Sequence, residues 1–381
     1  MRILHLWDNY APGLFDQSFD ICRGEGIETA LATMNLVVGA DERIPSGVRF
    51  VRRKAKTDDP QTWFGRFQRR ARERIDAGRF LRVVENSIKD FRPDALHIHF
   101  GTTAALLAGS DSLNLPFVVS FYGFDISQAL TNPRTRAAYG AVMSHDPLVH
   151  ILCAEAAERA AAMGARPDRI VDANLPLPLD RYPNVGVQQS SISRWLIPAR
   201  FVAKKGHEVL LEAFRRHLVD HPDHRLTCWG YGDGDKLRDR VERLGLSDRV
   251  SVINNEHEGP FDAAYLAQLR DHDVILAPSV RSPRGDDEGG PALTAVLAQV
   301  AGKPVIVSDF PGSERSVSDE VEGLVVPQGD PASLARAMAR LTADPALAKR
   351  MGQAGRARAL RDFSRDAYAS ALVGWYDRLT S

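Results

Sequence analysis

Short apolar runs alternate with longer amphipathic stretches along the whole chain. The runs have the length of buried strands, and the stretches between them place apolar residues at helical spacing. After residue 206, for example, one helical face collects Val209, Leu210, Ala213, Phe214 and His217. Strands that alternate with helices form parallel sheets with helices on both faces. The sequence therefore predicts an α/β fold.

The expected strands fall into two series. The first series is residues 2–7, 35–39, 48–52, 95–100, 117–122, 148–153 and 169–173. The second series is residues 194–198, 225–229, 250–254, 273–277, 304–308 and 323–327. Residues 174–192 lie between the two series and are rich in proline and polar residues, which is typical of an inter-domain linker. We therefore expect an N-terminal domain over 1–185 and a C-terminal domain over 186–363.

The chain ends in an amphipathic helix, expected over about 364–381. The large apolar residues of this helix are Tyr368, Leu372, Trp375 and Tyr376. An apolar helical face needs a surface to pack against. We expect this helix to cross back and pack on the N-terminal domain.

Length and composition fit a two-domain protein without a polyanionic partner. The chain has 381 residues and a formal net charge of zero, so no nucleic-acid partner is expected. Its three cysteines are far apart, which suits reduced thiols and fits neither a disulfide framework nor a metal site. The chain starts without a signal-peptide layout, and no apolar run reaches the roughly 18 residues that span a bilayer. We expect a cytoplasmic protein, either free or attached to the inner face of a membrane.

The segment Asp286-Asp287-Glu288-Gly289-Gly290-Pro291 precedes an apolar helix and a buried strand. Backbone N–H groups at a helix start attract anions, and glycines let a ligand approach them closely. An acidic side chain there cannot bind phosphate, but it can accept hydrogen bonds from hydroxyls. Together these features suit a nucleotide-sugar. The alternative reading of Glu288 is an ordinary carboxylate at a helix N-terminus.

Positive charge gathers at the start of the second domain, where Arg200, Lys204 and Lys205 precede Gly206. Arginine offers a bidentate fork and lysine a point charge, and both suit a diphosphate. The alternative is a solvated turn, because lysine and arginine are common in loops. The downstream segment around Glu288 favours the diphosphate reading.

Several motifs of the second half, in their order and spacing, resemble the family 4 glycosyltransferases, which have the GT-B fold. These motifs are Arg200-x4-Lys205-Gly206, Gly232-Asp233-Gly234, Ala277-Pro278-Ser279, Glu288-Gly289-Gly290-Pro291, Gly302-Lys303-Pro304-Val305 and Gly312-Ser313-Glu314. In the first half, residues 93–100 and Gly123-Phe124-Asp125 are weaker echoes. The resemblance covers nearly the whole chain and is specific in its second half.

A GT-B fold implies two Rossmann-like, parallel-sheet domains facing a cleft that holds the active site. The resemblance also implies a retaining hexosyltransferase that moves a sugar from a nucleotide-sugar donor to a hydroxyl of a glycan or lipid-linked acceptor. No metal ion or other cofactor is expected. The C-terminal domain would bind the donor and the N-terminal domain the acceptor, in bacterial cell-envelope or exopolysaccharide assembly. Same-face attack, with the leaving phosphate helping to take the acceptor proton, would require no protein base.

The resemblance also gives roles to particular residues. Arg200 and Lys205 would hold the diphosphate and stabilise it as it leaves, and Glu288 would accept hydrogen bonds from the sugar. On the donor side it places Gly289, Gly290, Pro291, Gly232, Asn254 and Ser279. On the acceptor or sugar side it places His99, Tyr122, Asp125 and Gly13. Turn-forming roles are the alternatives for Gly232, Asn254 and Asp125.

The chain departs from the family pattern at two places. A second glutamate, which contacts ribose, usually stands eight residues after the first, but Val296 occupies that position here. Asp286 or Asp287 could supply a replacement. The family often has histidine where this chain has Tyr122, and a phenol is a poor base near neutral pH.

The strand at 95–100 carries His97 and His99. We expect these two side chains to point to opposite faces of the sheet. The one nearer the strand's carboxyl end, His99, is expected to reach the ligand, because open α/β sheets bind ligands at that end. The other is expected to be a core histidine.

A basic run extends over residues 49–82 and includes Arg66, Arg69 and Arg70, with Trp63, Phe64 and Phe67 among the cations. A basic, aromatic, amphipathic helix can lie on anionic lipid, where a lipid-linked acceptor would approach. The alternative is the solvated face of a globular helix.

Two other functions fit a diphosphate clamp beside a carboxylate. A nucleotide-sugar epimerase of the same architecture would also use one, but it would need acid and base carboxylates around the sugar ring. A non-catalytic nucleotide-sugar-binding protein would bind the donor without turnover.

Overall fold

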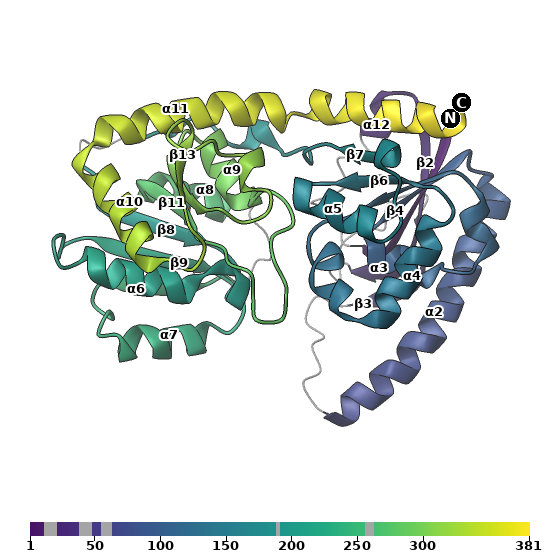
Figure 1. Cartoon of the computed structure of the whole chain (residues 1–381), viewed down its shortest axis with the longest axis horizontal. Helices are drawn as coiled ribbons and strands as arrows, with labels where there is room; N and C mark the ends of the chain where they lie inside the picture. The colour runs from purple at the N-terminus through teal and green to yellow at the C-terminus, as the bar shows by residue number, and fades with distance from the viewer. Residues whose placement is uncertain (11–20, 38–47, 55–62, 188–190, 256–262) are drawn as a thin grey trace. The chain divides into compact units, whose positions relative to one another are not determined.

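The computed structural model describes residues 1–10, 21–37, 48–54, 63–187, 191–255 and 263–381 (Figure 1). The described chain forms two compact units, and each is treated by itself. The first unit comprises Met1–Ile151, Ala156–Pro176 and Arg365–Ser381, and the second comprises Leu152–Glu155 and Leu177–Ser364. The break between the two long segments falls at Leu177, within the expected linker 174–192 and before the boundary that we expected at residue 185.

The first unit is built on a seven-stranded parallel sheet with the strand order β3-β2-β1-β4-β5-β6-β7. Its strands are β1 (Arg2–Tyr10), β2 (Glu28–Val37), β3 (Val48–Lys54), β4 (Ala95–His99), β5 (Phe117–Ser120), β6 (Leu148–Ile151) and β7 (Ile170–Asp172). Its helices are α2 (Trp63–Phe91), α3 (Gly101–Leu106), α4 (Pro133–Met143), α5 (Ala154–Ala162) and α12 (Arg365–Thr380). The first two residues of α5, Ala154 and Glu155, are assigned to the second unit. Strands β4, β5 and β6 are buried along their whole length, which explains their short, continuous apolar runs.

The second unit repeats this plan with a six-stranded parallel sheet in the order β10-β9-β8-β11-β12-β13. Its strands are β8 (Arg194–Pro198), β9 (Arg225–Gly230), β10 (Val250–Asn254), β11 (Val274–Ala277), β12 (Val305–Ser308) and β13 (Gly323–Val326). Its helices are α6 (His207–His217), α7 (Gly234–Arg243), α8 (Ala263–Asp271), α9 (Leu293–Val300), α10 (Pro331–Ala343) and α11 (Pro345–Asp362). Apolar side chains from α6, α10 and the sheet fill one fully buried core that includes Trp195, Phe214 and Met338.

Both sheets have the strand order of a Rossmann-like fold, in which the first strand lies at the centre and the chain order reverses beside it. The loops that leave the carboxyl ends of the strands next to this reversal are the usual ligand-binding loops. The expected α/β class and the two parallel-sheet domains are thus confirmed. No helix in the described residues is both long and apolar enough to cross a bilayer.

The final helix α12 belongs to the first unit, although the chain reaches it from the second. Its side chains Tyr368, Leu372, Trp375 and Tyr376 are all buried. The Tyr376 hydroxyl lies 2.8 Å from Nδ1 of His97 on β4. The expected packing of the last helix on the N-terminal domain is therefore confirmed.

One strand prediction was wrong. We expected a strand at 35–39, whereas β2 begins at Glu28 and runs to Val37. The segment escaped notice because it mixes alanine and threonine with few large apolar residues. Its buried polar groups are satisfied locally: the Thr33 hydroxyl donates to the Asn35 carbonyl at 3.0 Å, and the Asn35 amide donates to the Asp8 carbonyl at 3.3 Å.

Candidate active site

The glutamate loop, residues 278–292, connects β11 to α9 in the second unit. Helix α9 begins only at Leu293, so Glu288 and the glycines precede its first turn. Gly289 has a left-handed φ of 62°, a conformation that glycine adopts without strain. At Gly312 a Cβ would lie 2.4 Å from the Gly290 backbone, so the loop after β12 packs closely against the glutamate loop.

The cationic turn, residues 199–206, connects β8 to α6 beside the glutamate loop. Lys204 and Lys205 lie in a short 3-10 turn that ends at Gly206, whose φ is 73°. A Cβ at Gly206 would lie 1.9 Å from the Pro278 carbonyl oxygen. Glycine is therefore required there, and it brings the cationic turn directly against the start of the glutamate loop.

Lys205 and Glu288 form the central ion pair of this region. Nζ of Lys205 lies 2.6 Å from Oε1 and 2.9 Å from Oε2 of Glu288. The Ser279 hydroxyl donates to the same Oε1 at 2.5 Å. The side chains of Glu288 and Lys205 are only 8% and 17% exposed, so the pair is largely removed from water.

The electrostatic surroundings keep Glu288 ionised. Burial alone would raise its pKa, but the charges of Lys205 and Lys204 and the hydrogen bonds from Lys205 and Ser279 outweigh it, so the pKa lies below its ordinary value. For Lys205, burial is the largest effect and lowers the pKa; Lys204 and Arg200 act in the same direction, while Glu288 opposes them. The charges of Lys205 and Lys204 thus act on Glu288 directly, and the charge of Arg200 acts on Lys205.

Arg200 is the exposed member of this group. It lies beyond the end of β8, and its charge contributes to the lowered pKa of Lys205. Within the described part of the chain its guanidinium makes no hydrogen bond or ion pair. The structure therefore brings the three expected catalytic residues, Arg200, Lys205 and Glu288, into one region of one unit.

A second ion pair, between Lys204 and Asp286, lies next to the first. This pair was not predicted from the sequence. Nζ of Lys204 contacts Oδ1 of Asp286 at 3.1 Å and the Asp287 carbonyl oxygen at 2.9 Å. Asp287 is itself buried, with its carboxylate 3.6 Å from the Arg281 guanidinium. The two aspartates that we considered as ribose ligands are thus engaged by cations of the protein.

The other donor-side residues occupy turns around the same sheet end. Gly232 has a φ of 123° and forms a bridge with Phe201 of the cationic turn. Asn254 is exposed at the carboxyl end of β10, in register with Gly230. Pro291 is buried at the end of the glutamate loop. Val296 is fully buried in α9, so no carboxylate occupies the position of the family's second glutamate.

A cavity of about 600 Å³ adjoins the loop after β12, and all its lining residues belong to the second unit. It is lined by Ala154, Glu155, Asp309, Phe310, Pro311, Gly312, Ser313, Glu314, Val317, Ser318, Asp319, Val325 and Gln328. Its mixture of carboxylates and apolar groups suits a polyhydroxylated ligand. The close packing of Gly312 on Gly290 places this cavity next to the glutamate loop.

In the first unit, Asp125 is a turn-forming residue. Its carboxylate accepts hydrogen bonds from the backbone N–H groups of Gly101 at 2.8 Å and Tyr122 at 2.9 Å, and the side chain is fully buried. Burial raises its pKa to about 6, although these backbone hydrogen bonds partly oppose the rise. A turn-forming role accounts for these contacts, because the two carboxylate oxygens of Asp125 link the loop after β4 to the loop after β5.

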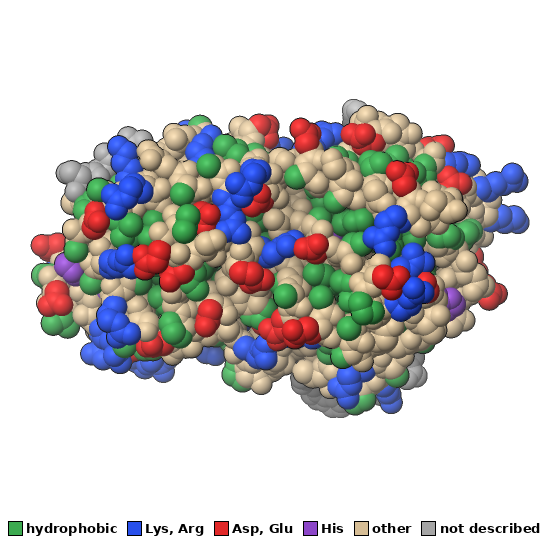
Figure 2. Space-filling model, turned by 45° about the horizontal axis from the view of Figure 1, so that its top comes forward, with side chains coloured by type: hydrophobic (Ala, Val, Ile, Leu, Met, Phe, Trp, Pro, Cys, Tyr) green, Lys and Arg blue, Asp and Glu red, His purple; other side chains and the backbone are tan. Residues whose placement is uncertain are grey.

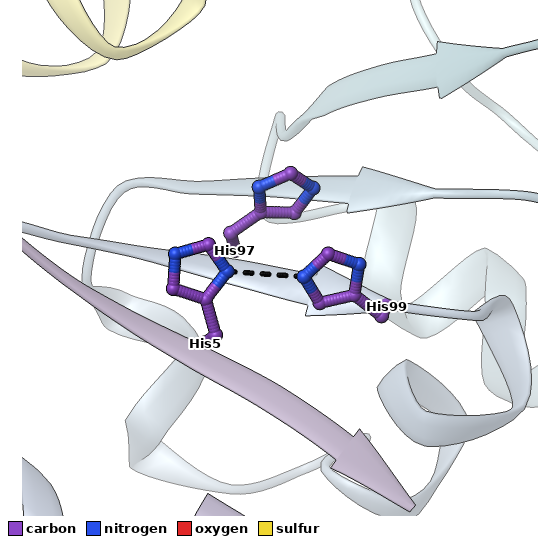
Figure 3. Close-up of side chains that lie close together, drawn as sticks. All are labelled: His5, His97 and His99. Carbon is purple, nitrogen blue, oxygen red and sulfur yellow. Dashed lines mark hydrogen bonds between the residues drawn. The ribbon is translucent and has the colours of Figure 1, made fainter. Parts of the chain in front are cut away.

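The prediction that His97 and His99 point to opposite faces was wrong. Residues i and i+2 of a strand share a face, and the two rings stack with their centroids 4.2 Å apart. Figure 3 shows both rings grouped with His5, which comes from the neighbouring strand β1. All three side chains are buried, so His99 is a core histidine as much as His97 is.

These histidines belong to a hydrogen-bonded network. Nε2 of His99 lies 3.0 Å from Nδ1 of His5, and Nδ1 of His99 lies 2.8 Å from the Tyr122 hydroxyl. Nδ1 of His97 is bound to Tyr376 and its Nε2 lies 2.8 Å from the Ser120 hydroxyl. Burial raises the pKa of Tyr122 well above its ordinary value, which makes this phenol an even poorer base than expected. Gly13, the remaining acceptor-side candidate, lies outside the described residues.

In the described part of the chain, nitrogen atoms of His5, His97 and His99 lie close enough together to share a metal ion. The orientation of the three rings, however, does not suit metal binding. Metal ligands aim their in-plane lone pairs at one common point, whereas His97 stacks on His99 with ring planes only 15° apart. The facing nitrogens of His5 and His99 are instead joined by a hydrogen bond, drawn in Figure 3.

The buried histidines make the stability of the first unit depend on pH. Burial lowers the pKa of His5 to about 3 and holds those of His97 and His99 well below their ordinary value. The unfolded chain therefore binds protons below about pH 6.5 that the folded chain does not, and stability falls as the pH falls. Asp125 acts in the opposite direction between about pH 6 and 4, because its folded-state pKa is raised.

We predict that the free energy of unfolding of this unit falls by about 3 kcal/mol per pH unit between pH 6 and 4 from these four groups, since each contributes about 1.4 kcal/mol per unit. Replacing His5 by asparagine removes one titrating group. The slope of unfolding free energy against pH, measured by urea denaturation, should become shallower by about 1.4 kcal/mol per unit. An unchanged slope in His5→Asn would contradict the assignment of a neutral buried His5.

Comparison with known proteins agrees with the fold and motifs described above. Residues 22–171 match the glycosyl transferase 4-like domain, and residues 194–358 match the glycosyl transferases group 1 family. The chain therefore belongs to the family 4 glycosyltransferases of the GT-B fold.

Among curated relatives, the chain is 27% identical over 259 residues to the putative colanic acid biosynthesis glycosyltransferase WcaL of Salmonella typhimurium, covering 66% of this chain and 62% of WcaL. It is 25% identical over 303 residues to the amylovoran biosynthesis glycosyltransferase AmsK of Erwinia amylovora, covering 78% of this chain and 73% of AmsK. It is 30% identical to the phosphatidyl-myo-inositol mannosyltransferase of Mycobacterium leprae over 52% of this chain and 49% of that enzyme.

Two solved structures have the same fold. Anabaena Alr3699/HepE, in complex with UDP and glucose, superposes with a TM-score of 0.74 at 18% identity, over 99% of this chain and all of that one. Sucrose-phosphate synthase from Thermosynechococcus elongatus gives a TM-score of 0.76 at 18% identity, over 99% of this chain and 98% of that one.

Proposed function

We propose that this protein is a retaining glycosyltransferase that transfers a hexose from a nucleotide-sugar to a glycan or lipid-linked acceptor. The observation that supports the proposal is the buried Lys205–Glu288 pair at the carboxyl end of a Rossmann-like sheet. Ser279 donates a hydrogen bond to Glu288, and the charge of Arg200 acts on Lys205. Membership of the glycosyltransferase family favours transfer over epimerisation.

The cations suit the donor diphosphate. An ammonium group has three N–H donors, and Lys205 directs two contacts to the oxygens of Glu288. The third donor is available for a phosphate oxygen. Arg200, which is exposed and makes no ion pair within the described residues, can add a bidentate contact. We propose that these two side chains stabilise the charge of the leaving diphosphate, with no metal ion or other cofactor required.

Glu288 suits the sugar. An ionised carboxylate can accept about four hydrogen bonds, and Lys205 and Ser279 make three contacts with it. Its Oε2 keeps capacity for a sugar hydroxyl. Burial lowers the pKa of His97 and raises the pKa of Tyr122, so neither side chain suits a general base near neutral pH. We therefore propose that the leaving phosphate accepts the acceptor proton during same-face attack.

The relatives support a substrate class. WcaL and AmsK are named for colanic acid and amylovoran biosynthesis, and HepE was solved with UDP and with UDP-glucose. We propose a UDP-hexose as donor, cell-envelope or extracellular polysaccharide assembly as the setting, and the cytoplasm as the location. The cavity beside the glutamate loop has room for part of a sugar.

The proposed site can be tested by replacing either member of the Lys205–Glu288 ion pair. Glu288→Gln and Lys205→Met should each lower kcat for sugar transfer by about a hundredfold to a thousandfold, because each removes a preorganised charge at the reacting centre. Removal of one partner of a buried pair also costs stability, so each variant should be checked by its melting curve.

The exposed residues Glu85 and Lys349 provide matched controls outside the two loops. Glu85→Gln and Lys349→Met should leave transfer unchanged. Turnover close to wild type in a folded Glu288→Gln or Lys205→Met variant would remove the basis of the proposed function.

We also propose that the basic run of residues 49–82 binds the inner face of a membrane. Helix α2 covers its second half, but the side chains of residues 63–76 lie outside those the structure describes. On the face drawn in Figure 2, in contrast, basic and acidic side chains are interspersed. Local rather than net charge would therefore determine lipid binding.

The combined variant Arg66→Gln, Arg69→Gln and Arg70→Gln should weaken binding to vesicles of anionic lipid at low salt. Each basic residue near such a surface contributes about 1 kcal/mol, so the loss should be on the order of a hundredfold. Hydrolysis of the donor in solution should be unaffected. Unchanged vesicle sedimentation would favour the solvated-helix reading of this segment.

A further inference from the structure

Lys204 and Lys205 are neighbours in one turn, yet they hold different parts of the glutamate loop. Lys205 contacts Glu288, where the proposed chemistry takes place. Lys204 contacts Asp286 and Asp287, the two residues that precede Glu288. The Lys204 side chain is 7% exposed, too buried for an ordinary solvated lysine.

Lys204 attaches the loop at two places. Its carbonyl oxygen accepts a hydrogen bond from the Val280 backbone N–H at 2.8 Å, near the start of the loop. Its ammonium binds the Asp286 carboxylate and the Asp287 carbonyl, six to seven residues later. One residue thus fixes the entry to the loop and the approach to Glu288.

The loop between these attachments is closed on itself. The Ser282 N–H donates to the Asp286 carbonyl at 2.8 Å, and the Ser282 hydroxyl accepts from the Asp286 N–H at 3.0 Å. Arg281 lies 3.6 Å from the buried Asp287 carboxylate. A closed loop moves as one body, so holding Asp286 and Asp287 sets the position of Glu288, the next residue.

We infer that Lys204 is the positioning residue of the glutamate loop: by binding Asp286 and the Asp287 carbonyl, it sets Glu288 against Lys205 in the geometry that sugar transfer requires. The inference rests on the proposed function and adds to it a residue that contacts neither donor nor acceptor. Positioning of this kind matters because a displacement of about 1 Å at a reacting centre can cost about a hundredfold in rate.

Lys204 also acts on Glu288 through its charge. After the effect of burial, which opposes them, the charges of Lys205 and Lys204 are the main reasons that Glu288 stays ionised. Two other titratable groups, Arg200 and His207, interact with Lys205. In the same loop, Asp286 is paired with Lys204, and Asp287 lies 3.6 Å from Arg281. Loss of Lys204 should raise the pKa of Glu288, and loss of the Asp286 charge should lower it.

The opposite charges of Lys204 and Asp286 allow a positioning role to be distinguished from a purely structural one. Lys204→Met and Asp286→Asn break the same ion pair, so a purely structural role predicts similar effects. The inference predicts effects of opposite sign on the ionisation of Glu288. The carboxyl resonance of Glu288, followed by carbon NMR in protein labelled at glutamate Cδ and assigned with Glu288→Gln, reports that ionisation without requiring activity.

The expected result for Lys204→Met is a Glu288 resonance that titrates at higher pH than in the wild type. Its kcat for transfer should fall by about tenfold to a hundredfold, with a smaller change in KM for the donor. The acid limb of its kcat profile should move to higher pH. In Asp286→Asn the titration should move to lower pH, and the double variant should lie between the two single variants. Lys349→Met, on the exposed face of α11, serves as the control and should match the wild type.

Two results would overturn the inference. In one, Lys204→Met and Asp286→Asn lower the melting temperature and kcat together without shifting the Glu288 titration in opposite directions. In the other, a folded Lys204→Met variant transfers sugar like the wild type. A third result would separate the two proposals. If the two variants shift the Glu288 titration in opposite directions but the wild-type protein transfers no sugar from any UDP-hexose, the proposed function is refuted and the role of Lys204 in holding Glu288 stands.

Discussion

The arrangement of the glutamate loop and the cationic turn depends on one buried ion pair, between Lys205 and Glu288. A buried pair of this kind contributes little net stability, because the loss of hydration offsets the attraction. It is a costly way to join two loops unless the charges are needed. The surrounding structure supports the pair: Gly206 permits contact with Pro278, Ser279 donates to the carboxylate, and Lys204 holds the preceding residues. Loss of either partner would therefore affect both the stability of the unit and the proposed chemistry.

The two units use polar burial differently. In the second unit, the buried charges of Lys204, Lys205 and Glu288 converge on the glutamate loop. In the first, Asp125 accepts hydrogen bonds from the backbone of two loops at the carboxyl end of the sheet. The histidines of β1 and β4 bind one another and the hydroxyl groups of Tyr122, Tyr376 and Ser120. The network orders the Tyr122 loop, and its stability falls in acid because neutral imidazole is required.

Apolar periodicity was sufficient to predict the α/β class, the two sheets and the return of the last helix, because buried parallel strands are short continuous apolar runs. It failed at β2, where alanine and threonine replace large apolar residues. Motif spacing brought Arg200, Lys205 and Glu288 together as candidates, and they do share one region. It placed Lys204 among the cations before Gly206 but gave it no role of its own, because its contacts with Asp286 and Asp287 are seen only in the structure. The histidines were misplaced through an error of strand parity, since i and i+2 share a face.

The central claim is that Lys205 binds the diphosphate while Glu288 binds the sugar. Calorimetric dissociation constants for UDP and for the tightest-binding UDP-hexose, compared between wild type, Lys205→Met and Glu288→Gln, test it most directly. The account predicts that Lys205→Met weakens both ligands, whereas Glu288→Gln weakens the UDP-hexose by about tenfold relative to UDP, the value of one charged hydrogen bond. Equal effects of Glu288→Gln on the two ligands, or unchanged UDP binding in Lys205→Met, would contradict it.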